Sequence, residues 1–436
     1  MTALGGAYIA LAEGTEGSAA NSAAPAVRNA YSTTWFDYDL SAGISFPGAF
    51  TNTDFDNHGD NANLPPNHAS AGNFTDLTVG GTLQLGGLGV SATGDLEQFS
   101  LTTTAGEPAL TLQVGRFKAL MSYGVYGGQI AIGGGVRVVT MQIQQNGAGT
   151  LLTMAGASPE VGALLMPTGL PWRIGATVRA PVSGGVGVGF LGQQIFPGSA
   201  APSSSTNLVL PSQVVMPWEA EIGFALQLGP RPLNPGWENP HREEGPLRRE
   251  IERDRGERRG RQAEELASLP PNERAARKVE LMAEEKALRA LEDEHLAEES
   301  ARLNRARKAR YANWPRERIL LLASVLFTGQ SPNAVSLEGF LDQRVETVGR
   351  ELSVAPRVGL EAEPVLNHVV LRTGTYVEPS RYEGSAARQH FTFGGDIRLV
   401  PLNFWGLLPD DPWKLGLFVD LAPRYTNYGF GFGNWH

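Results

Sequence analysis

The chain of 436 residues contains no cysteine, which excludes a disulfide framework, a cysteine-ligated zinc site and a thiol nucleophile. It also lacks a basic excess: 36 Lys+Arg stand against 45 Asp+Glu, a net charge of −9. This balance argues against a general nucleic-acid-binding surface. No apolar run approaches the ~20 residues that a membrane-spanning helix needs, since the longest runs only from Ile319 to Phe327. The sequence therefore excludes a helical membrane protein.

Charge is concentrated in one segment. Residues 241–310 hold 18 Lys+Arg and 17 Asp+Glu, so half of the segment is charged. Its Ala, Leu, Glu, Arg and Lys content favours helix, and a helix start at 270–272 precedes an unbroken run to about Ala312. The flanking sequence is rich in glycine, threonine, valine and aromatic residues instead. We therefore expect a β-rich body that is interrupted by a charged α-helical insertion at residues 230–315.

Apolar and polar residues alternate along the flanking segments. Between Trp218 and Leu228 the even positions are apolar, while Glu219 and Glu221 stand at odd positions. Successive side chains of a strand point to opposite faces, so such a strand has one apolar and one polar face. A soluble sandwich and a barrel with lipid outside and a polar lumen both fit this pattern. Segments of about ten residues, alternating short and long connections, and aromatic residues near segment ends favour a transmembrane antiparallel β-barrel.

The candidate strands number fourteen, and an even number places both chain ends on one side of a membrane. The insertion then divides the barrel into residues 35–229 and 316–436, which follow an N-terminal segment at 1–34. Long connections at 47–72, 145–155, 183–212, 330–352 and 378–388 fall on one side, and the insertion falls on the other, where turns are short. The candidate strands lie at 35–46, 73–86, 88–101, 110–125, 129–144, 156–166, 172–182, 213–228, 316–329, 353–363, 368–377, 389–400, 413–421 and 427–435.

Charged strand residues are expected to face the lumen, because an arginine that faces lipid at mid-membrane costs roughly 2–4 kcal/mol. There they either pair with one another and stiffen the wall or line a ligand path. His390 would serve an esterase only beside a serine, and no serine-based signature accompanies it. The expected lumen residues are Arg173, Arg179, Glu219, Glu221, Arg357, Glu361, Arg372, His390, Asp396 and Arg398.

The first thirty residues have no strand pattern and consist mainly of small side chains. Gly5-Gly6-Ala7 is followed by Asn21-Ser22-Ala23-Ala24. This segment resembles the N-terminal hatch of the FadL-like family of outer-membrane transporters for hydrophobic compounds such as long-chain fatty acids. Family members begin with Gly-Gly-Ala and continue to Asn-Pro-Ala, so Ser22 stands where the family has proline. The resemblance implies a plug in the lumen and a hydrophobic small-molecule ligand beside Gly5, Gly6, Asn21, Ser22 and Ala23. The alternative is a disordered terminus.

Two functions follow from these patterns. The first is a channel in a Gram-negative outer membrane, surrounded by its lipid, that passes hydrophobic or amphipathic molecules such as fatty acids and performs no catalysis. The second is a non-transporting scaffold for envelope assembly or secretion that holds a periplasmic protein partner through residues 241–310; a solvent-exposed arm is the simpler reading of that segment. No export signal precedes the hatch-like segment. Neither a cofactor nor a metal is expected, since the histidines are scattered and residues 54–60 fail the EF-hand template.

Overall fold

The computed structural model describes residues 1–29, 32, 34–48, 54–59, 74–101, 110–145, 149–185, 211–237, 239–315, 317–337, 346–401 and 412–435. The chain divides into two compact units. The barrel unit comprises residues 1–30, 38–236 and 315–436, and the hairpin unit comprises residues 31–37 and 237–314. None of the described helices is both long enough and apolar enough to cross a membrane.

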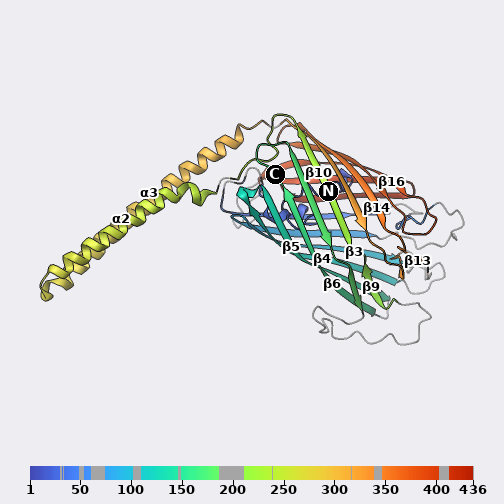
Figure 1. Cartoon of the computed structure of the whole chain (residues 1–436), viewed down its shortest axis with the longest axis horizontal. Coiled ribbons are helices and arrows are strands. Elements are labelled where there is room, and N and C mark those ends of the chain that lie inside the picture. Colours follow the sequence, from blue (N-terminus) through green and yellow to red (C-terminus); the bar gives the residue numbers. More distant parts are fainter. Residues whose placement is uncertain are drawn as a thin grey trace. The chain divides into compact units, whose positions relative to one another are not determined.

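The barrel unit is a closed antiparallel sheet of fourteen strands, in which consecutive strands pair (Figure 1). β10 pairs with β11 across the helical insertion, and β1 pairs with β18 where the chain ends meet. All fourteen predicted strands are present, and the sandwich alternative is wrong. The strands are β1 (Phe36–Ser45), β2 (Thr75–Leu85), β3 (Leu88–Leu101), β4 (Leu110–Val125), β5 (Ile130–Gln145), β6 (Gly149–Leu165), β7 (Trp172–Arg179), β10 (Glu219–Leu228), β11 (Ile319–Thr328), β14 (Ser353–Val365), β15 (Val369–Glu378), β16 (Arg388–Pro401), β17 (Pro412–Ala422) and β18 (Tyr425–Asn434).

The two ends of the barrel differ in their connections. At the short-turn end, β2 and β3 are joined by two residues, and η3 (Tyr126–Gly128) joins β4 to β5. The opposite, long-connection end carries two small sheets outside the barrel ladder. One pairs β8 (Val182–Gly185) with β9 (Gln213–Met216), and the other pairs β12 (Ala334–Val335) with β13 (Thr347–Val348). The helical insertion joins β10 to β11 at the short-turn end, as predicted.

One predicted connection is wrong. Residues 145–155 were expected to form a long loop, but β6 begins at Gly149 and pairs with β5 along this stretch. The polarity of the alternation is inverted here: Leu152 and Met154 point inward and are buried. Apolar residues that face the lumen do not match the pattern of a lipid-facing strand, so the alternation hides the strand. The predicted strand ends at 182 and 213 likewise belong to the β8–β9 sheet rather than to the barrel.

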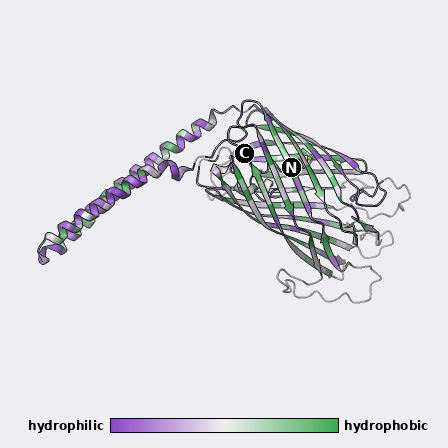
Figure 2. Ribbon diagram, viewed as in Figure 1, coloured by the Kyte–Doolittle hydropathy of each residue, from purple (hydrophilic) through white to green (hydrophobic). Residues whose placement is uncertain are grey.

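The outer face of the barrel is apolar. Val161 and Leu371 have 58% and 52% of their surface exposed, and large aliphatic and aromatic side chains are exposed on most strands. Figure 2 shows hydrophobic colour on the barrel strands and a largely hydrophilic helical insertion. An exposed apolar face on a closed sheet is the arrangement of a barrel whose solvent is lipid.

The N-terminal residues 1–29, here called the plug, fold inside the barrel (Figure 1, blue). The plug contains η1 (Thr2–Leu4), α1 (Gly14–Ser18) and η2 (Ala24–Ala26). η1 contacts β14 to β17, whereas α1 and η2 contact strands among β2 to β5. The plug therefore crosses the lumen from one part of the wall to another. The alternative of a disordered terminus is wrong.

The hairpin unit consists mainly of two antiparallel helices, α2 (Pro240–Ser268) and α3 (Pro271–Ala312). The side chain of Asn239 caps α2 by accepting a hydrogen bond from the backbone of His241 at 3.0 Å. Ion pairs join the helices along their length, from Arg277–Glu265 near the tip to Arg307–Glu243 near the base. The helix predicted to run to about Ala312 is confirmed.

Candidate functional site

The plug approaches the wall at glycines. A Cβ atom on Gly133 would lie 2.0 Å from the carbonyl oxygen of Ser22, and one on Gly175 would lie 2.3 Å from that of Ile9. Gly162 stands in the same relation to Asn21, whose Oδ1 would lie 2.2 Å from an added Cβ. Real Cβ atoms do not come this close to other atoms, so the wall must be glycine at these positions. Much of the glycine in the strands therefore serves the fit between plug and wall.

Polar side chains fix the plug in place. Asn21 donates to the wall carbonyl of Ala163 at 3.1 Å, and its Oδ1 accepts from the backbone of Ala23 at 3.0 Å. Ser22 donates to Glu160 of β6 at 2.7 Å. A proline at this position would lack that hydroxyl, so Ser22 supplies a hydrogen bond to the wall that proline could not make. All three residues are fully buried.

The middle of the plug is held at α1. The backbone N–H of Thr15 donates to the carboxylate of Asp39 at 2.6 Å. The hydroxyl of Thr15 donates to the backbone carbonyl of Asp39 at 2.7 Å. Glu16 accepts from Lys414 of β17 at 2.7 Å. Glu13 pairs with Arg173 of β7. α1 is thus connected by charge to both sides of the barrel, which opposes its movement as long as these pairs remain intact.

An ion-pair chain continues from Lys414 along the wall. Lys414 lies 3.6 Å from Asp396, which accepts from Arg372 at 2.6 Å. Arg372 also donates to Glu361 at 2.7 Å. Three of the predicted lumen residues, Arg372, Asp396 and Glu361, therefore form one buried network. Of the two roles that the sequence left open for them, this network corresponds to pairing that stiffens the wall.

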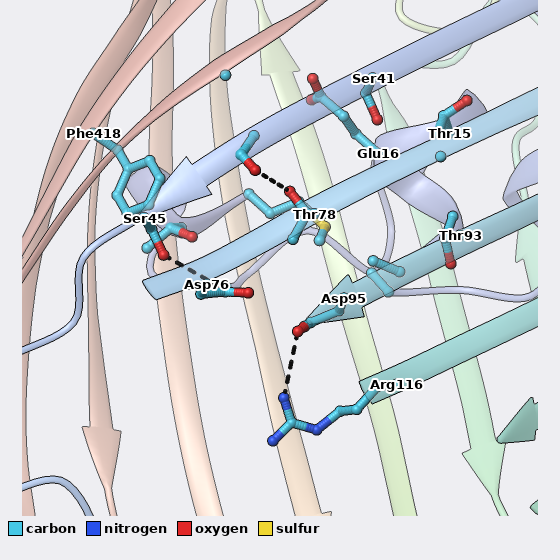
Figure 3. A pocket seen from close by; sticks show the side chains of 18 of the residues that line it. Thr15, Glu16, Ser41, Ser45, Asp76, Thr78, Thr93, Asp95, Arg116 and Phe418 are labelled. Carbon is cyan, nitrogen blue, oxygen red and sulfur yellow. Dashed lines mark hydrogen bonds and ion pairs between the residues drawn. The ribbon is translucent and has the colours of Figure 1, made fainter. Parts of the chain in front are cut away.

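A cavity of about 690 Å³ lies between the plug and the wall. Figure 3 shows Thr15 and Glu16 of the plug beside Ser41 of β1 and Thr93 of β3. The strands that border it here carry small side chains on their inner face; Gly431, for example, has no atom closer than 3.9 Å to an added Cβ. The cavity is therefore an open space inside the barrel rather than a groove on its surface.

One side of the cavity is rich in cations. Lys118, Arg137 and Arg179 line it beside Glu219. Arg137 and Arg179 share Glu219 at 3.2 and 3.3 Å, and Lys118 lies 3.3 Å from Glu160 behind the lining. Three cations thus share two carboxylates. Lys118 donates to the plug carbonyl of Ala19 at 2.8 Å, so one of the three N–H bonds of its ammonium group is left for a ligand.

The neighbouring side is rich in carboxylates. Arg116 holds Glu97 through both of its terminal nitrogens, at 2.5 and 2.8 Å, and lies 3.7 Å from Asp95. Asp76 accepts from Ser45 at 3.2 Å (Figure 3). Three carboxylates accompany a single guanidinium here. The cavity therefore has opposite local charge on these two sides, and of the two an acidic ligand group fits the side with Lys118.

A cluster of buried apolar side chains, here called the apolar cap, lies at the long-connection end of the described part of the barrel. Phe74 and Phe99 stack with ring centroids 4.2 Å apart, and Phe55 contacts both rings. Val139 belongs to the cap, Met216 packs against it, and both also line the cavity. The cavity thus runs from an apolar end to a charged end. The buried members of the cap are Phe74, Phe99, Leu112, Val114, Val139, Met141, Ile143, Leu152, Met154, Val182 and Val214.

His390 is enclosed by acceptors. Its Nδ1 lies 2.9 Å from Asp420 and its Nε2 lies 2.8 Å from Glu378, while the ring of Tyr376 stacks on it at 4.2 Å. Both nitrogens can donate only when the imidazole is protonated. His390 therefore acts as a buried ion-pair partner and has no free nitrogen that could serve as a general base for a serine.

Sequence reasoning identified part of this site. Of the predicted residues, Gly5, Gly6, Arg179, Glu219, Glu221, Arg357, Arg372 and Asp396 line the cavity. Asn21, Ser22, Ala23, Arg173, Glu361, His390 and Arg398 do not line it; the first six anchor the plug or the wall network, and Arg398 donates to the carbonyl of Asn367 at 3.4 Å. Asp420, an expected pairing partner of the lumen arginines, also lines the cavity. The charged lining residues that were missed are Glu16, Asp76, Asp95, Arg116, Lys118, Arg137 and Lys414.

The missed residues differ in how they could have been found. Arg116 and Lys118 stand two positions apart in the predicted strand 110–125, so its alternation places both on one face. Asp76 belongs to β2 in the same way. Glu16 lies in a short helix of the plug, and no periodicity of the sequence points to it.

The structure also explains the acidic residue Asp54 in the segment 54–60 that fails the EF-hand template. The carboxylate of Asp54 accepts from the backbone of His58 at 2.8 Å and of Gly59 at 3.2 Å. It is therefore used to hold the turn. Among the described residues, which do not include Asp60, no group of three or more His, Asp or Glu side chains is placed to hold a metal ion.

Comparison with solved structures finds several chains that are similar to this one. The chain is similar to the CymD monoaromatic hydrocarbon channel at 9% identity and a TM-score of 0.48, covering 99% of this chain and 94% of that one. It is similar to a Pseudomonas aeruginosa FadL homologue at 10% identity and a TM-score of 0.47, covering 98% and 94%. The Ralstonia pickettii toluene transporter TbuX matches at 11% identity and a TM-score of 0.44, covering 98% of both chains.

No protein-family model matches the chain, and no curated protein matches it. Similarities of this size do not decide family, ligand or activity.

Proposed function

We propose that this protein is an outer-membrane channel that takes an amphipathic acid, such as a fatty acid, into the cavity between plug and wall. The observation that carries the proposal is the polarity of that cavity. It is apolar where Val139 and Met216 line it and cationic at Lys118, Arg137 and Arg179. A molecule with an aliphatic tail and a carboxylate matches both ends.

The outer surface supports the membrane placement. A closed sheet has no edge strands, and its exposed aliphatic side chains suit lipid rather than water. A soluble protein would not expose apolar side chains on most strands of one sheet. Barrels with this polarity reside in outer membranes, and this property supports the localisation.

The carboxylate of the ligand would be held by charge-assisted hydrogen bonds. Lys118 has a donor to spare, and the local excess of one cation over the carboxylates favours an anion. The neighbouring carboxylates around Arg116 repel an acid, which restricts its head group to one side of the cavity. Passage through the barrel then requires the plug to shift, because the plug crosses the lumen beside this site.

Filling the cavity tests the proposal. Gly431 lines the cavity and has room for a side chain, so Gly431→Leu occupies ligand space without a clash with backbone. We expect radiolabelled laurate to bind the purified protein in detergent about tenfold more weakly in this variant, the loss that ~1.4 kcal/mol produces. The matched control is Gly236→Leu, which adds a side chain near Thr168, away from the cavity.

Two outcomes would count against the channel. Laurate binding that is equal in both variants would mean that the cavity is not the site. Absence of any laurate binding by the unaltered protein, together with no amphiphile detected by native mass spectrometry, would favour the scaffold function that acts through residues 241–310.

A further inference from the structure

The base of the helical hairpin has a charge opposite to the rest. Residues 300–312 contain five cations and no carboxylate, whereas residues 240–299 contain 13 cations and 17 carboxylates. The five cations are Arg302, Arg305, Arg307, Lys308 and Arg310. The last three turns of α3 are thus strongly positive, whereas residues 240–299 together carry a net charge of −4.

Internal pairing does not account for this excess. Arg307 pairs with Glu243 at 2.7 Å, and Arg302 pairs with Glu299. Arg305 and Lys308 are exposed, and no described residue forms an ion pair with either. Basic residues in the last turn complement the helix dipole, but that effect is confined to the final turn, and Arg302 and Arg305 lie further from the end at Ala312.

Aromatic residues accompany the cations. Trp314 packs edge-on against Tyr311 with ring centroids 4.6 Å apart. Trp35, which is partly exposed, stacks on His241 at the first turn of α2, with centroids 5.1 Å apart. All four residues belong to the hairpin unit. Tyr311 is buried and supports Trp314. Tryptophan beside lysine and arginine is the composition that proteins present to the head-group layer of a membrane.

The covalent chain limits where this basic segment can lie. Only residues 313–318 separate the end of α3 from the start of β11. Six residues of extended chain span at most ~20 Å, and the cations lie two to ten helical residues before Ala312, at a rise of about 1.5 Å per residue. The cations of α3 are therefore tethered within about 35 Å of the first residue of β11.

We propose that the base of the hairpin, residues 300–314 with Trp35, binds the phosphate groups of anionic phospholipids in the leaflet at the short-turn end of the barrel. Arg305 and Lys308 supply charge, and Trp35 and Trp314 supply interfacial packing. The net negative remainder of the hairpin is repelled by the same surface and stays in water. This inference rests on the membrane placement of the proposed function and goes beyond it.

The natural chain has no cysteine, so a single introduced cysteine can carry a nitroxide. The label is placed at the exposed Ala309 (Ala309→Cys) in the full-length protein in nanodiscs, and its accessibility to a water-soluble nickel chelate is measured by electron paramagnetic resonance. We expect accessibility to fall about threefold when about 30% phosphatidylglycerol replaces phosphatidylcholine, and to recover at about 1 M salt, where charge is screened.

Two double variants test whether the effect depends on the cations at the base of the hairpin or on the total charge of the hairpin. Arg305→Glu with Lys308→Glu should abolish the effect of phosphatidylglycerol. Lys278→Glu with Lys286→Glu changes two exposed cations elsewhere on α3 that also have no described ion-pair partner, and should leave it unchanged. A label at the exposed Ala283 should be equally accessible in both lipids.

Two results would overturn the inference. One is equal accessibility of Ala309→Cys in the two lipids. The other is protection in phosphatidylcholine discs when inorganic phosphate is added, which would assign the site to a soluble anion. A label at Val161→Cys on the outer face of β6 tells which of the two proposals has failed. If this label is not exposed to lipid, the membrane placement of the barrel is wrong. If it is exposed to lipid, only the inference about the base of the hairpin is wrong.

Discussion

The plug and the helical hairpin are two non-strand segments attached to the same sheet, and they are stabilised in different ways. The plug is enclosed by the barrel and consists of small residues in contact with wall glycines such as Gly133 and Gly175. The hairpin is mainly exposed, and rows of Arg–Glu pairs such as Arg255–Glu292 and Arg258–Glu285 hold its helices together. The first depends on steric fit, and the second depends on solvated charge.

This difference has an energetic consequence. An ion pair inside the lumen has lost most of its water, so removal of one partner leaves a charge that is costly to bury. An exposed pair retains water and contributes little. Equivalent substitutions in the two segments should therefore have unequal effects, and the following predictions test that expectation from the largest effect to the smallest.

The largest effect is expected from a side chain in the plug–wall contact. Gly133→Val places atoms within 2.0 Å of the carbonyl oxygen of Ser22, which backbone cannot avoid without moving. Overpacking of a core costs about 1–3 kcal/mol and more where, as here, backbone atoms must move; displacement of the plug relieves the strain. We expect single-channel conductance in planar bilayers to rise severalfold as the lumen opens.

The control for this variant is Gly124→Val on the neighbouring strand β4, where an added Cβ has no atom closer than 3.6 Å. It should conduct like the unaltered protein. Equal conductance of Gly133→Val and Gly124→Val would show that steric fit at the wall does not hold the plug.

The second prediction compares one buried and one exposed ion pair directly. Lys414→Met removes the cation that binds Glu16 of the plug at 2.7 Å. We expect the free energy that holds the plug in place to fall by about 3 kcal/mol. This value is the lower end of the range for breaking a buried ion pair, because a third of the Glu16 side chain remains exposed. Arg277→Met on the hairpin, which removes pairs to Glu265 and Glu280, should cause no measurable loss.

Hydrogen–deuterium exchange of the full chain measures both changes in one experiment. Lys414→Met should accelerate exchange across residues 1–29 and leave the hairpin unchanged, whereas Arg277→Met should leave the plug unchanged. Equal acceleration in the two segments would contradict the distinction between buried and solvated pairs.

The strands were predictable because alternation depends on a local physical rule. β10 shows apolar Ile222 and Phe224 facing outward between small or polar residues that face inward, and all fourteen barrel strands were predicted. β6 was cut short because the rule assumes lipid outside, whereas Leu152 and Met154 face the apolar cap inside the lumen. The rule fails where the interior becomes apolar.

The site was less predictable because it depends on register and on the path of the plug. Lys118 of β4 lies near Glu160 of β6, and Arg137 of β5 lies near Glu219 of β10. Alternation tells which side a residue faces but not which residue from a distant strand stands opposite, since that follows from strand stagger around the barrel. Residue patterns therefore predicted that the lumen is charged, but not that cations and carboxylates gather on different sides of the cavity.

The third prediction concerns those two sides. Lys118→Met removes the cation with a donor to spare and keeps a side chain of similar length. We expect laurate to bind about tenfold more weakly while dodecanol binding changes little, because only the acid uses the charge; a tenfold change corresponds to ~1.4 kcal/mol. Competition binding with both compounds measures the difference.

The matched control is Arg116→Met on the same strand, two positions away, which leaves the cation-rich side intact. It should weaken laurate binding less than Lys118→Met does. A larger effect of Arg116→Met would place the head group of the ligand on the opposite side of the cavity.

The smallest effect is expected from acid on the hairpin. The hydrogen bond from Arg289 lowers the pKa of Glu285, burial opposes this, and Arg258 lowers it further. A carboxyl whose pKa is lower in the folded hairpin than its unfolded value, about 4.3, stabilises the fold above that pH, and the contribution is lost as pH falls through the depressed folded value. We therefore expect the helices to separate slightly below about pH 4.3.

Nitroxides at Ala263→Cys and Ala276→Cys report this separation, because both positions are exposed and lie on opposite helices near the tip. With Glu285→Gln the acid-induced widening of the distance distribution should shrink, since the group that titrates is gone. Glu298→Gln, an exposed carboxyl on α3 without a described ion-pair partner, should leave the widening as it is. Equal acid responses in the two variants would mean that the net charge of the hairpin, and not the interhelical pair of Glu285 with Arg258, controls the separation of the helices. The difference between the hairpin and the plug would then lie only in the steric fit of the plug to the wall.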